Sequence, residues 1–135
     1  MSLPLAEGKK GYFGLGAYKK IDNFLAKIDV LAIGCGLGLE ASTQKLVRKI
    51  ITGVKKPAVI DADAINSLAG ALSFFKNGCK REFILTPHPG EMARMLGVSV
   101  KSVQASRIET ARKFARDYHL TLVLKGGHSV VCSGK

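Results

Sequence analysis

The chain has 135 residues, of which 47% are hydrophobic, and its 21 lysines and arginines against 10 aspartates and glutamates give a net charge of +11. This apolar content excludes a disordered chain, and no apolar run approaches the roughly 18 residues of a membrane helix. One domain fits the length. No secretory leader opens the sequence, so we expect a cytoplasmic protein without a membrane partner.

The excess of basic residues is spread along the chain and forms no single patch. Residues 1–60 carry 10 basic and 4 acidic side chains, and residues 61–135 carry 11 and 6. No aromatic side chains are interleaved with the basic pairs, as they are in platforms that stack nucleic-acid bases. We therefore expect no nucleic-acid partner, and a basic surface that suits phosphate-rich small ligands.

The spacing of cysteine and histidine argues against a disulfide framework and against a metal centre. The cysteines are three in number, far apart and without Cys-x-x-Cys pairing: Cys35, Cys79 and Cys132. This usage is typical of reduced cytosolic thiols. The histidines have no further ligand at metal-binding spacing. The sequence therefore predicts no protein-built metal site.

Apolar runs alternate with segments of helical periodicity after an irregular, glycine- and lysine-rich opening over residues 4–20. The predicted strands are residues 28–33, 57–60, 82–86, 121–125 and 128–132. The predicted helices are residues 42–54 with Ser42 as N-cap, residues 65–75 followed by Gly78, residues 90–96, and residues 103–118. The last two strands are close enough in sequence to form a hairpin.

Short apolar strands separated by amphipathic helices predict an α/β fold with a mostly parallel sheet and helices on both faces. In such sheets ligands bind beyond the carboxyl ends of the strands. Four chemically rich segments follow the predicted strands: residues 34–38, 61–66, 86–91 and 125–129. We therefore expect these segments to meet at one edge of the sheet.

The first segment is a glycine loop, with Gly34, Gly36 and Gly38 after the first strand. Glycines let backbone amides approach a ligand, and the N-terminus of the following helix favours an anion. A phosphate cradle and a tight turn are both consistent with this pattern, which matches neither the dinucleotide fingerprint nor a P-loop. Cys35 lies between two of the glycines, and we assign it no catalytic role.

The second segment carries two carboxylates in an acid-poor chain. Asp61 and Asp63 could hold Mg²⁺ through water, accept hydrogen bonds from sugar hydroxyls, or cap the next helix. Asp63 stands immediately before the predicted helix, which favours capping. Asn66 lies one turn further along and could face the same crevice.

The third segment places His88 between two prolines, which stiffen the backbone around the ring. A histidine held in this way at a strand end favours contact with a ligand. Glu91 falls in the first turn of the next helix, where the helix dipole also stabilises a carboxylate. Ligand binding and helix stabilisation are both open for Glu91.

The fourth segment joins a cation, two open amides and a hydroxyl. It consists of Lys125, Gly126, Gly127, His128 and Ser129. This set suits the phosphate and ribose of a nucleotide, and it also makes the turn of the predicted hairpin.

Taken together, the motifs resemble the ADP/ATP-dependent NAD(P)H-hydrate dehydratase family of the ribokinase-like superfamily. The resemblance runs from about Asp29 to about Val131 and rests on four motifs in this order: residues 33–38, 59–66, 85–97 and 123–126. The Thr-Pro-His-Pro-Gly-Glu and Asp-Ala-Asp-Ala-x-Asn runs are specific to it, whereas the glycine motifs are not specific taken singly.

The resemblance implies a three-layer ribokinase-like domain that repairs hydrated NADH or NADPH. In that reaction a nucleotide phosphorylates the hydroxyl of the damaged ring, and phosphate is then eliminated. The implied substrate contacts are Gly34, Gly36, Gly38, Asp61, Asp63, Asn66, His88 and Glu91, and the implied nucleotide contacts are Lys125 to Ser129. ADP or ATP is the implied cofactor, and Mg²⁺ remains an option.

Two departures from the family pattern qualify these implications. Cys35 stands where the family commonly has proline. The family's Gly-x-Gly-Asp segment, which supplies the catalytic aspartate, does not occur up to Lys135. We therefore assign no catalytic residue, expect residues 1–135 to form a single domain that is incomplete at its C-terminal end, and expect this chain alone to lack dehydratase activity.

Two other functions stay open on the sequence. One is a small-molecule kinase of the same superfamily, acting on a hydroxymethylpyrimidine, a thiazole or a sugar. The other is a non-catalytic nucleotide-binding remnant. An incomplete sheet exposes an edge and apolar surface, so we also expect a homo-oligomer or a complementary chain.

Overall fold

Five strands form one sheet in the computed structural model, which describes residues 2–8, 11–76 and 82–134. The strands are β1 (Leu31–Ile33), β2 (Ala58–Ile60), β3 (Phe83–Leu85), β4 (Thr121–Leu124) and β5 (Val130–Ser133), in that spatial order. The first four are parallel, and β5 returns antiparallel to β4 as the predicted hairpin. Each of the five predicted strands is present, mostly one to three residues shorter than expected.

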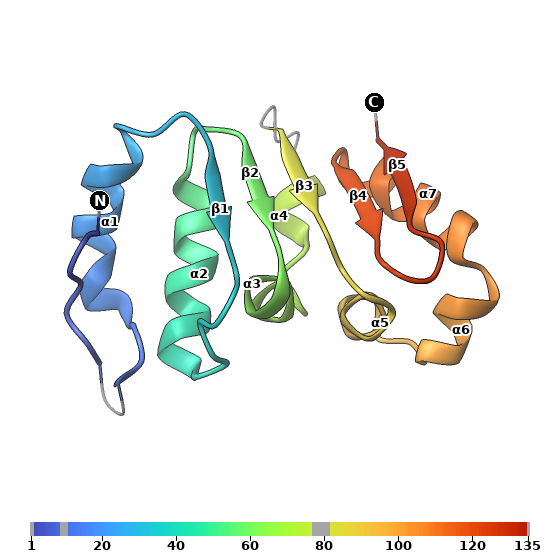
Figure 1. The fold of residues 1–135 in the computed structure, drawn as a ribbon, viewed down its shortest axis with the longest axis horizontal. Coiled ribbons are helices and arrows are strands. Elements are labelled where there is room, and N and C mark those ends of the chain that lie inside the picture. Colours follow the sequence, from blue (N-terminus) through green and yellow to red (C-terminus); the bar gives the residue numbers. More distant parts are fainter. Residues whose placement is uncertain (1, 9–10, 77–81, 135) are drawn as a thin grey trace.

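Two helices precede the first strand, and the others lie in the connections between β1 and β4 (Figure 1). The helices are the 3₁₀ helix η2 (Leu15–Ala17) and the α-helices α1 (Tyr18–Leu25), α2 (Ala41–Gly53), α3 (Ala62–Leu68), α4 (Ser73–Lys76), α5 (Pro89–Leu96), α6 (Val100–Ala105) and α7 (Arg107–Tyr118). The sequence did not predict α1, which begins inside the segment expected to be irregular.

Several predicted helix boundaries are wrong. The single helix predicted for residues 65–75 is divided into α3 and α4 in the structure. The single helix predicted for residues 103–118 is divided into α6 and α7, because Ser106 leaves the helical conformation with φ −139° and ψ +46°. Ser42 does not cap α2, since the helix begins at Ala41 with Glu40 in the N-cap position. Gly78 and Cys79 lie outside the described residues.

The sheet has one covered face and one open face. Strand order follows chain order, and right-handed crossovers then place the connecting helices on the same side. Side chains alternate accordingly, as in β2, where Ala58 and Ile60 are buried and Val59 is half-buried. We call the other side the bare face. The residues of the bare face lie opposite one another on neighbouring strands or two positions apart on one strand. They are Ala32, Val59, Ile84, Thr121, Val123 and Val131.

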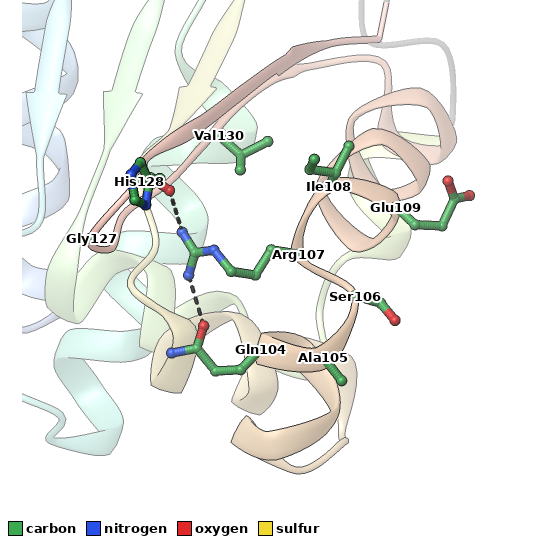
Figure 2. A pocket seen from close by; sticks show the side chains of 9 residues that line it. All are labelled: Gln104, Ala105, Ser106, Arg107, Ile108, Glu109, Gly127, His128 and Val130. Carbon is green, nitrogen blue, oxygen red and sulfur yellow. Dashed lines mark hydrogen bonds between the residues drawn. The ribbon is translucent and has the colours of Figure 1, made fainter.

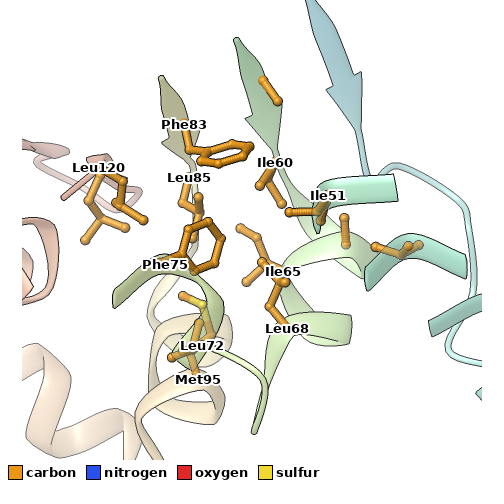
Figure 3. Close-up of a cluster of buried hydrophobic side chains, with 14 of the residues drawn as sticks. Ile51, Ile60, Ile65, Leu68, Leu72, Phe75, Phe83, Leu85, Met95 and Leu120 are labelled. Atoms are coloured by element: carbon orange, nitrogen blue, oxygen red, sulfur yellow. The ribbon is translucent and has the colours of Figure 1, made fainter. Parts of the chain in front are cut away.

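The α/β class and the mostly parallel sheet are thus as predicted. The second helical layer of the expected three-layer arrangement does not occur among the described residues, whose strands lie in front of α4 and α7 in Figure 1. The covered face holds the core, in which Ile60, Leu85 and Phe75 are completely buried (Figure 3). The rings of Phe75 and Phe83 meet edge to face with centroids 5.4 Å apart. None of the described helices is long and apolar enough to span a membrane.

Candidate functional site

The carboxyl ends of β1 to β4 meet at one edge, and backbone hydrogen bonds continue from strand to strand beyond the strands themselves. The Asp61 amide donates to the Ile33 carbonyl at 3.0 Å and the Thr86 amide to the Ile60 carbonyl at 3.1 Å. The Lys125 amide donates to the Pro87 carbonyl at 2.8 Å. These bonds draw all four predicted segments into one continuous edge, as the rule for parallel sheets requires.

Gly34 makes the closest approach in this edge. Its φ of +148° lies outside the range of ordinary side-chain-bearing residues. A Cβ atom on Gly34 would lie 1.8 Å from the Asp61 carbonyl oxygen. The glycine is therefore needed where the end of β1 lies against the end of β2, and the backbone of the loop is fixed against Asp61.

Asp61 and Lys125 form an ion pair across the edge, from the end of β2 to the end of β4. Lys125 Nζ donates to Asp61 Oδ1 at 2.7 Å, and each side chain is about a third to two-fifths exposed, at 33% and 41%. Burial favours the neutral carboxyl group, but hydrogen bonds from Lys125, Thr86 and the Ala62 amide, with the charge of Lys125, outweigh it and lower the pKa of Asp61. Asp61 therefore remains an anion that holds the lysine in place.

Asp63 does not cap the following helix, contrary to the prediction. Asp61 occupies the N-cap position of α3 without a side-chain capping bond, and Asp63 lies in the first turn. Its carboxylate instead accepts a hydrogen bond from the Gly38 amide at 2.8 Å, which ties the glycine loop to α3. Asn66 accepts a hydrogen bond from Arg94 of α5. Both side chains thus lock elements together at the edge.

His88 begins α5 through a reciprocal capping arrangement. Its Nδ1 accepts from the Gly90 amide at 3.0 Å and the Glu91 amide at 3.3 Å, while the Glu91 carboxylate accepts from the His88 amide at 2.8 Å. Glu91 is 5% exposed, whereas 54% of the His88 side chain is exposed. Glu91 is therefore committed to the helix terminus, and the imidazole is held in a fixed position with an open surface.

The turn between β4 and β5 is fixed by Arg107, a residue that the sequence did not single out. Arg107 Nη2 donates to the carbonyls of Leu124 at 3.2 Å, Lys125 at 3.3 Å and His128 at 2.9 Å. Arg107 Nη1 donates to Gln104 Oε1 at 2.9 Å (Figure 2). No sequence motif marks this arginine, because its partners are backbone carbonyls that only the fold brings near.

The same arginine leaves no room for a side chain at position 126. A Cβ atom there would lie 2.6 to 2.9 Å from the Arg107 guanidinium. Beside this turn a cavity of about 650 Å³ opens between the α6–α7 junction and the hairpin (Figure 2). Gly127, His128 and Val130 form one wall, and Arg107 lies at its base. The predicted nucleotide-binding turn therefore borders a space large enough for a small ligand.

A second cavity of about 470 Å³ lies at the other end of the edge. Its lining residues are Ala32, Ile33, Gly34, Cys35, Leu37, Val59 and Asp61. Two of these, Ala32 and Val59, belong to the bare face, and Cys35 is exposed. The described residues contain no group of three histidine, cysteine or acidic side chains placed to hold a metal ion.

The chain was compared with known proteins. The family model of NAD(P)H-hydrate dehydratase matches residues 12–135. The chain belongs to the NAD(P)H-hydrate dehydratase family. A bifunctional NAD(P)H-hydrate repair enzyme of Moorella thermoacetica is 41% identical over 131 residues, which are 97% of this chain and 24% of that enzyme.

Solved structures agree in fold. The ADP/ATP-dependent NAD(P)H-hydrate dehydratase of Bacillus subtilis, co-crystallized with ATP and Mg²⁺, is 37% identical with a TM-score of 0.63, over 78% of this chain and 36% of that one. A ribokinase-like superfamily protein of Enterococcus faecalis, 20% identical with a TM-score of 0.69 over 85% of this chain and 39% of that one, supports the fold alone. The chain thus spans between about a quarter and two-fifths of these relatives.

Proposed function

We propose that this chain carries the substrate and nucleotide edge of an enzyme that dehydrates hydrated NADH or NADPH at the expense of ADP or ATP. The observation that supports the proposal most is the Asp61–Lys125 ion pair. It joins the motif that the family resemblance places at the substrate to the motif that it places at the nucleotide. A cytoplasmic location is part of this proposal.

The substrate end would use the fixed groups of the crevice. The glycine loop presents its backbone beside the 470 Å³ cavity, and His88 presents its exposed ring nearby on the same edge. Asp63 orients the glycine loop through its bond to the Gly38 amide, while Asp61 and Asn66 hold Lys125 and Arg94 at the same edge. In this role the three are positioning residues.

The nucleotide end would use Lys125 and the turn that follows it. The Lys125 side chain is 41% exposed and lies at the strand edge, where its ammonium group can meet a phosphate. The Gly126 and Gly127 amides, His128 and Ser129 lie along an exposed turn that Arg107 holds in place. The basic groups would neutralise phosphate charge during phosphoryl transfer.

Magnesium would reach this site together with the nucleotide. The described residues supply no cluster of three acidic or nitrogen ligands, whereas Mg²⁺ commonly binds through one or two carboxylates and substrate phosphates. Asp61 and Asp63, whose carboxylate is 2.8 Å from the Gly38 amide, are the carboxylates of the strand-end segments that could take part. When bound, the ion would screen the phosphate charge.

Calorimetric titration of the chain with ADP and with ATP tests the nucleotide end. We expect binding that Lys125→Ala weakens tenfold or more, since it removes the only side-chain cation of the 125–129 motif. Lys27→Ala, at an exposed residue just after α1, should leave it unchanged. Equal affinities for both variants would contradict the assignment. Formation of NADH from hydrated NADH is then measured by absorbance. If the chain instead phosphorylates a hydroxymethylpyrimidine, a thiazole or a sugar, the result favours a small-molecule kinase.

A further inference from the structure

A third cavity, of about 170 Å³, lies between β1, α2 and the chain segment that leads into α1. Figure 1 shows this segment and α1 beside α2, at the end of the sheet that β1 forms. Leu5, Phe13 and Ile21 line the cavity from the segment and from α1, and Leu46 and Val47 line it from α2. Nine of the ten lining residues are apolar. The cavity is thus an apolar compartment under the first part of the chain.

Thr43 is the one polar residue of this lining, and its hydroxyl group already has a partner. The hydroxyl donates to the Phe13 carbonyl at 2.7 Å, and Thr43 is completely buried. Among the described residues, no buried side-chain nitrogen or oxygen lacks a hydrogen-bond partner. A buried water needs roughly two to four polar partners, which this lining does not supply. The cavity therefore favours an apolar occupant over water.

The volume of the cavity indicates the size of that occupant. A protein cavity of about 150 Å³ lined by leucine, isoleucine and phenylalanine stays dry and binds benzene or xenon. The cavity under the first part of this chain has a similar volume and the same types of lining residue. A single unsubstituted ring or a short hydrocarbon chain therefore fits it, whereas a nucleotide is too large and too polar.

The glycine loop forms part of the wall of this cavity. Ile33 at the end of β1 and Leu37 in the loop line both the 170 Å³ cavity and the 470 Å³ cavity beside Gly34. The residue after Leu37 is Gly38, whose amide donates to the Asp63 carboxylate at 2.8 Å. The apolar cavity and the substrate end of the candidate site are therefore separated by the same two side chains.

The segment that covers the cavity also touches the loop directly. A Cβ atom on Gly38 would lie 2.6 Å from the Tyr12 ring, so the ring packs closely against this glycine. The next residue, Phe13, lines the cavity and accepts the hydrogen bond from Thr43. A change in the packing of the cavity can therefore reach the glycine loop through Leu37 and through Tyr12.

We propose that the 170 Å³ cavity binds a small apolar molecule of about the size of benzene, and that this molecule restrains the glycine loop. An occupant supplies van der Waals contacts to Ile33 and Leu37 that an empty cavity cannot supply. The loop then departs less often from the conformation in which Gly38 bonds to Asp63. The site lies apart from the nucleotide turn, and its occupation requires no turnover.

Benzene is the probe for this site. It is titrated into the 135-residue chain without nucleotide or substrate, and the NMR shifts of labelled methyl groups of Leu46, Val47 and Ile50 are followed. We expect saturable shifts, and binding of benzoate at least tenfold weaker, because its carboxylate would be buried without a partner. Leu31→Phe, on the edge strand β1, places a larger side chain in the lining and should weaken benzene binding tenfold or more. Leu39→Phe, at a residue 49% exposed and outside the lining, is the matched control and should not.

Circular dichroism establishes that each variant is folded. Val47→Ile adds a single methylene group to the lining and serves as a second variant, which should weaken benzene binding about threefold. Because the substitution is small, it keeps the test valid if Leu31→Phe does not fold.

Hydrogen exchange of residues 34–38, followed by mass spectrometry, tests the effect on the glycine loop. We expect benzene to slow this exchange at least threefold in the parent and in Leu39→Phe, but not in Leu31→Phe, and to leave the turn at residues 126–128 unchanged. The proposal is overturned if benzene does not shift the methyl groups, if benzoate binds equally well, or if Leu31→Phe binds as tightly as Leu39→Phe. It is also overturned if exchange in the loop is unaffected. These results are independent of the proposed activity, since no turnover is measured.

Discussion

The two ends of the strand edge are built in different ways. At the crevice end, around Gly34, Asp61 and His88, several backbone contacts and side-chain bonds within the chain fix the polar groups. At the turn end, one guanidinium of Arg107 holds three carbonyls, and the side chains of residues 128 and 129 remain exposed. The crevice is thus preorganised by contacts from several residues, whereas at the turn one side chain, that of Arg107, makes three of the bonds.

This difference suggests that the crevice orients a ligand, whereas the turn can adapt to one. A preorganised crevice loses little freedom when a ligand binds, so it suits the recognition of one ring in one pose. A turn held at its base by Arg107 can vary in its exposed half without disturbing the sheet. Substitutions at the crevice should therefore damage the fold, and those at the turn should mainly damage binding.

The largest effect is expected from Gly34→Ala. The added Cβ would lie 1.8 Å from the Asp61 carbonyl oxygen, in backbone that cannot move without breaking the β1–β2 pairing. We expect the free energy of unfolding to fall by about 3 kcal/mol or more, measured by urea denaturation. Gly36→Ala is the control, since its surroundings are open and only its φ of +71° opposes the change. Equal losses at the two positions would show that the crevice is not tightly constrained.

Gly126→Ala should have a smaller effect on stability and a clear one on nucleotide binding. The new methyl group would displace the flexible Arg107 guanidinium from its three carbonyls. We expect a loss of about 1–2 kcal/mol in unfolding free energy and weaker ADP binding by calorimetry. Arg107→Ala should cause a similar loss, and the double variant should lose little more than either single one. Strict additivity would mean that Arg107 does not act through Gly126, and Gly127→Ala is the control.

His88 separates a structural role from a binding role. His88→Ala removes the acceptor for the Gly90 and Glu91 amides, and an N-cap loss of this kind costs about 1 kcal/mol. His88→Asn restores a capping oxygen and should recover that stability. If the imidazole contacts the hydrated dinucleotide, neither variant should bind it as the parent does. If His88→Asn recovers binding, the role of His88 is to cap the helix and not to contact the ligand.

The sequence predicted the strands and the common edge because both depend on local patterns. Continuous apolar runs predict buried strands, and the ends of parallel strands must share an edge, so the residues around Gly34, Asp61, His88 and Lys125 could be grouped without coordinates. The partners of those residues could not. The contacts of Asp61 with Lys125, Asn66 with Arg94 and Arg107 with Leu124 join positions 17 to 64 residues apart.

The errors have similarly particular causes. Asp63 has the residue type and the sequence position of a helix cap, but its carboxylate accepts a hydrogen bond from the Gly38 amide instead. Ser106 interrupts an otherwise continuous helical pattern, because its φ and ψ let α7 turn away from α6. The alternation of apolar strands with helices predicts helices on both faces, whereas the described helices lie on one face, because the strands follow one another in chain order.

The smallest effect concerns the pH dependence that the Asp61–Lys125 pair adds. Because the pKa of Asp61 is lowered in the folded chain, its contribution to stability is fully present above the ordinary carboxyl pKa of about 3.9. It is lost as the pH falls through the lowered value, where the folded carboxylate takes up its proton. Asp61→Asn should therefore cost about 1 kcal/mol or less at pH 6, and the difference from the parent should shrink below about pH 4. Lys125→Met should reduce this pH dependence without abolishing it, because Thr86 and the Ala62 amide also lower the pKa of Asp61. Urea denaturation at pH 6 and pH 3 measures both, and an undiminished difference at pH 3 would mean that the pair does not join the two ends of the edge in solution.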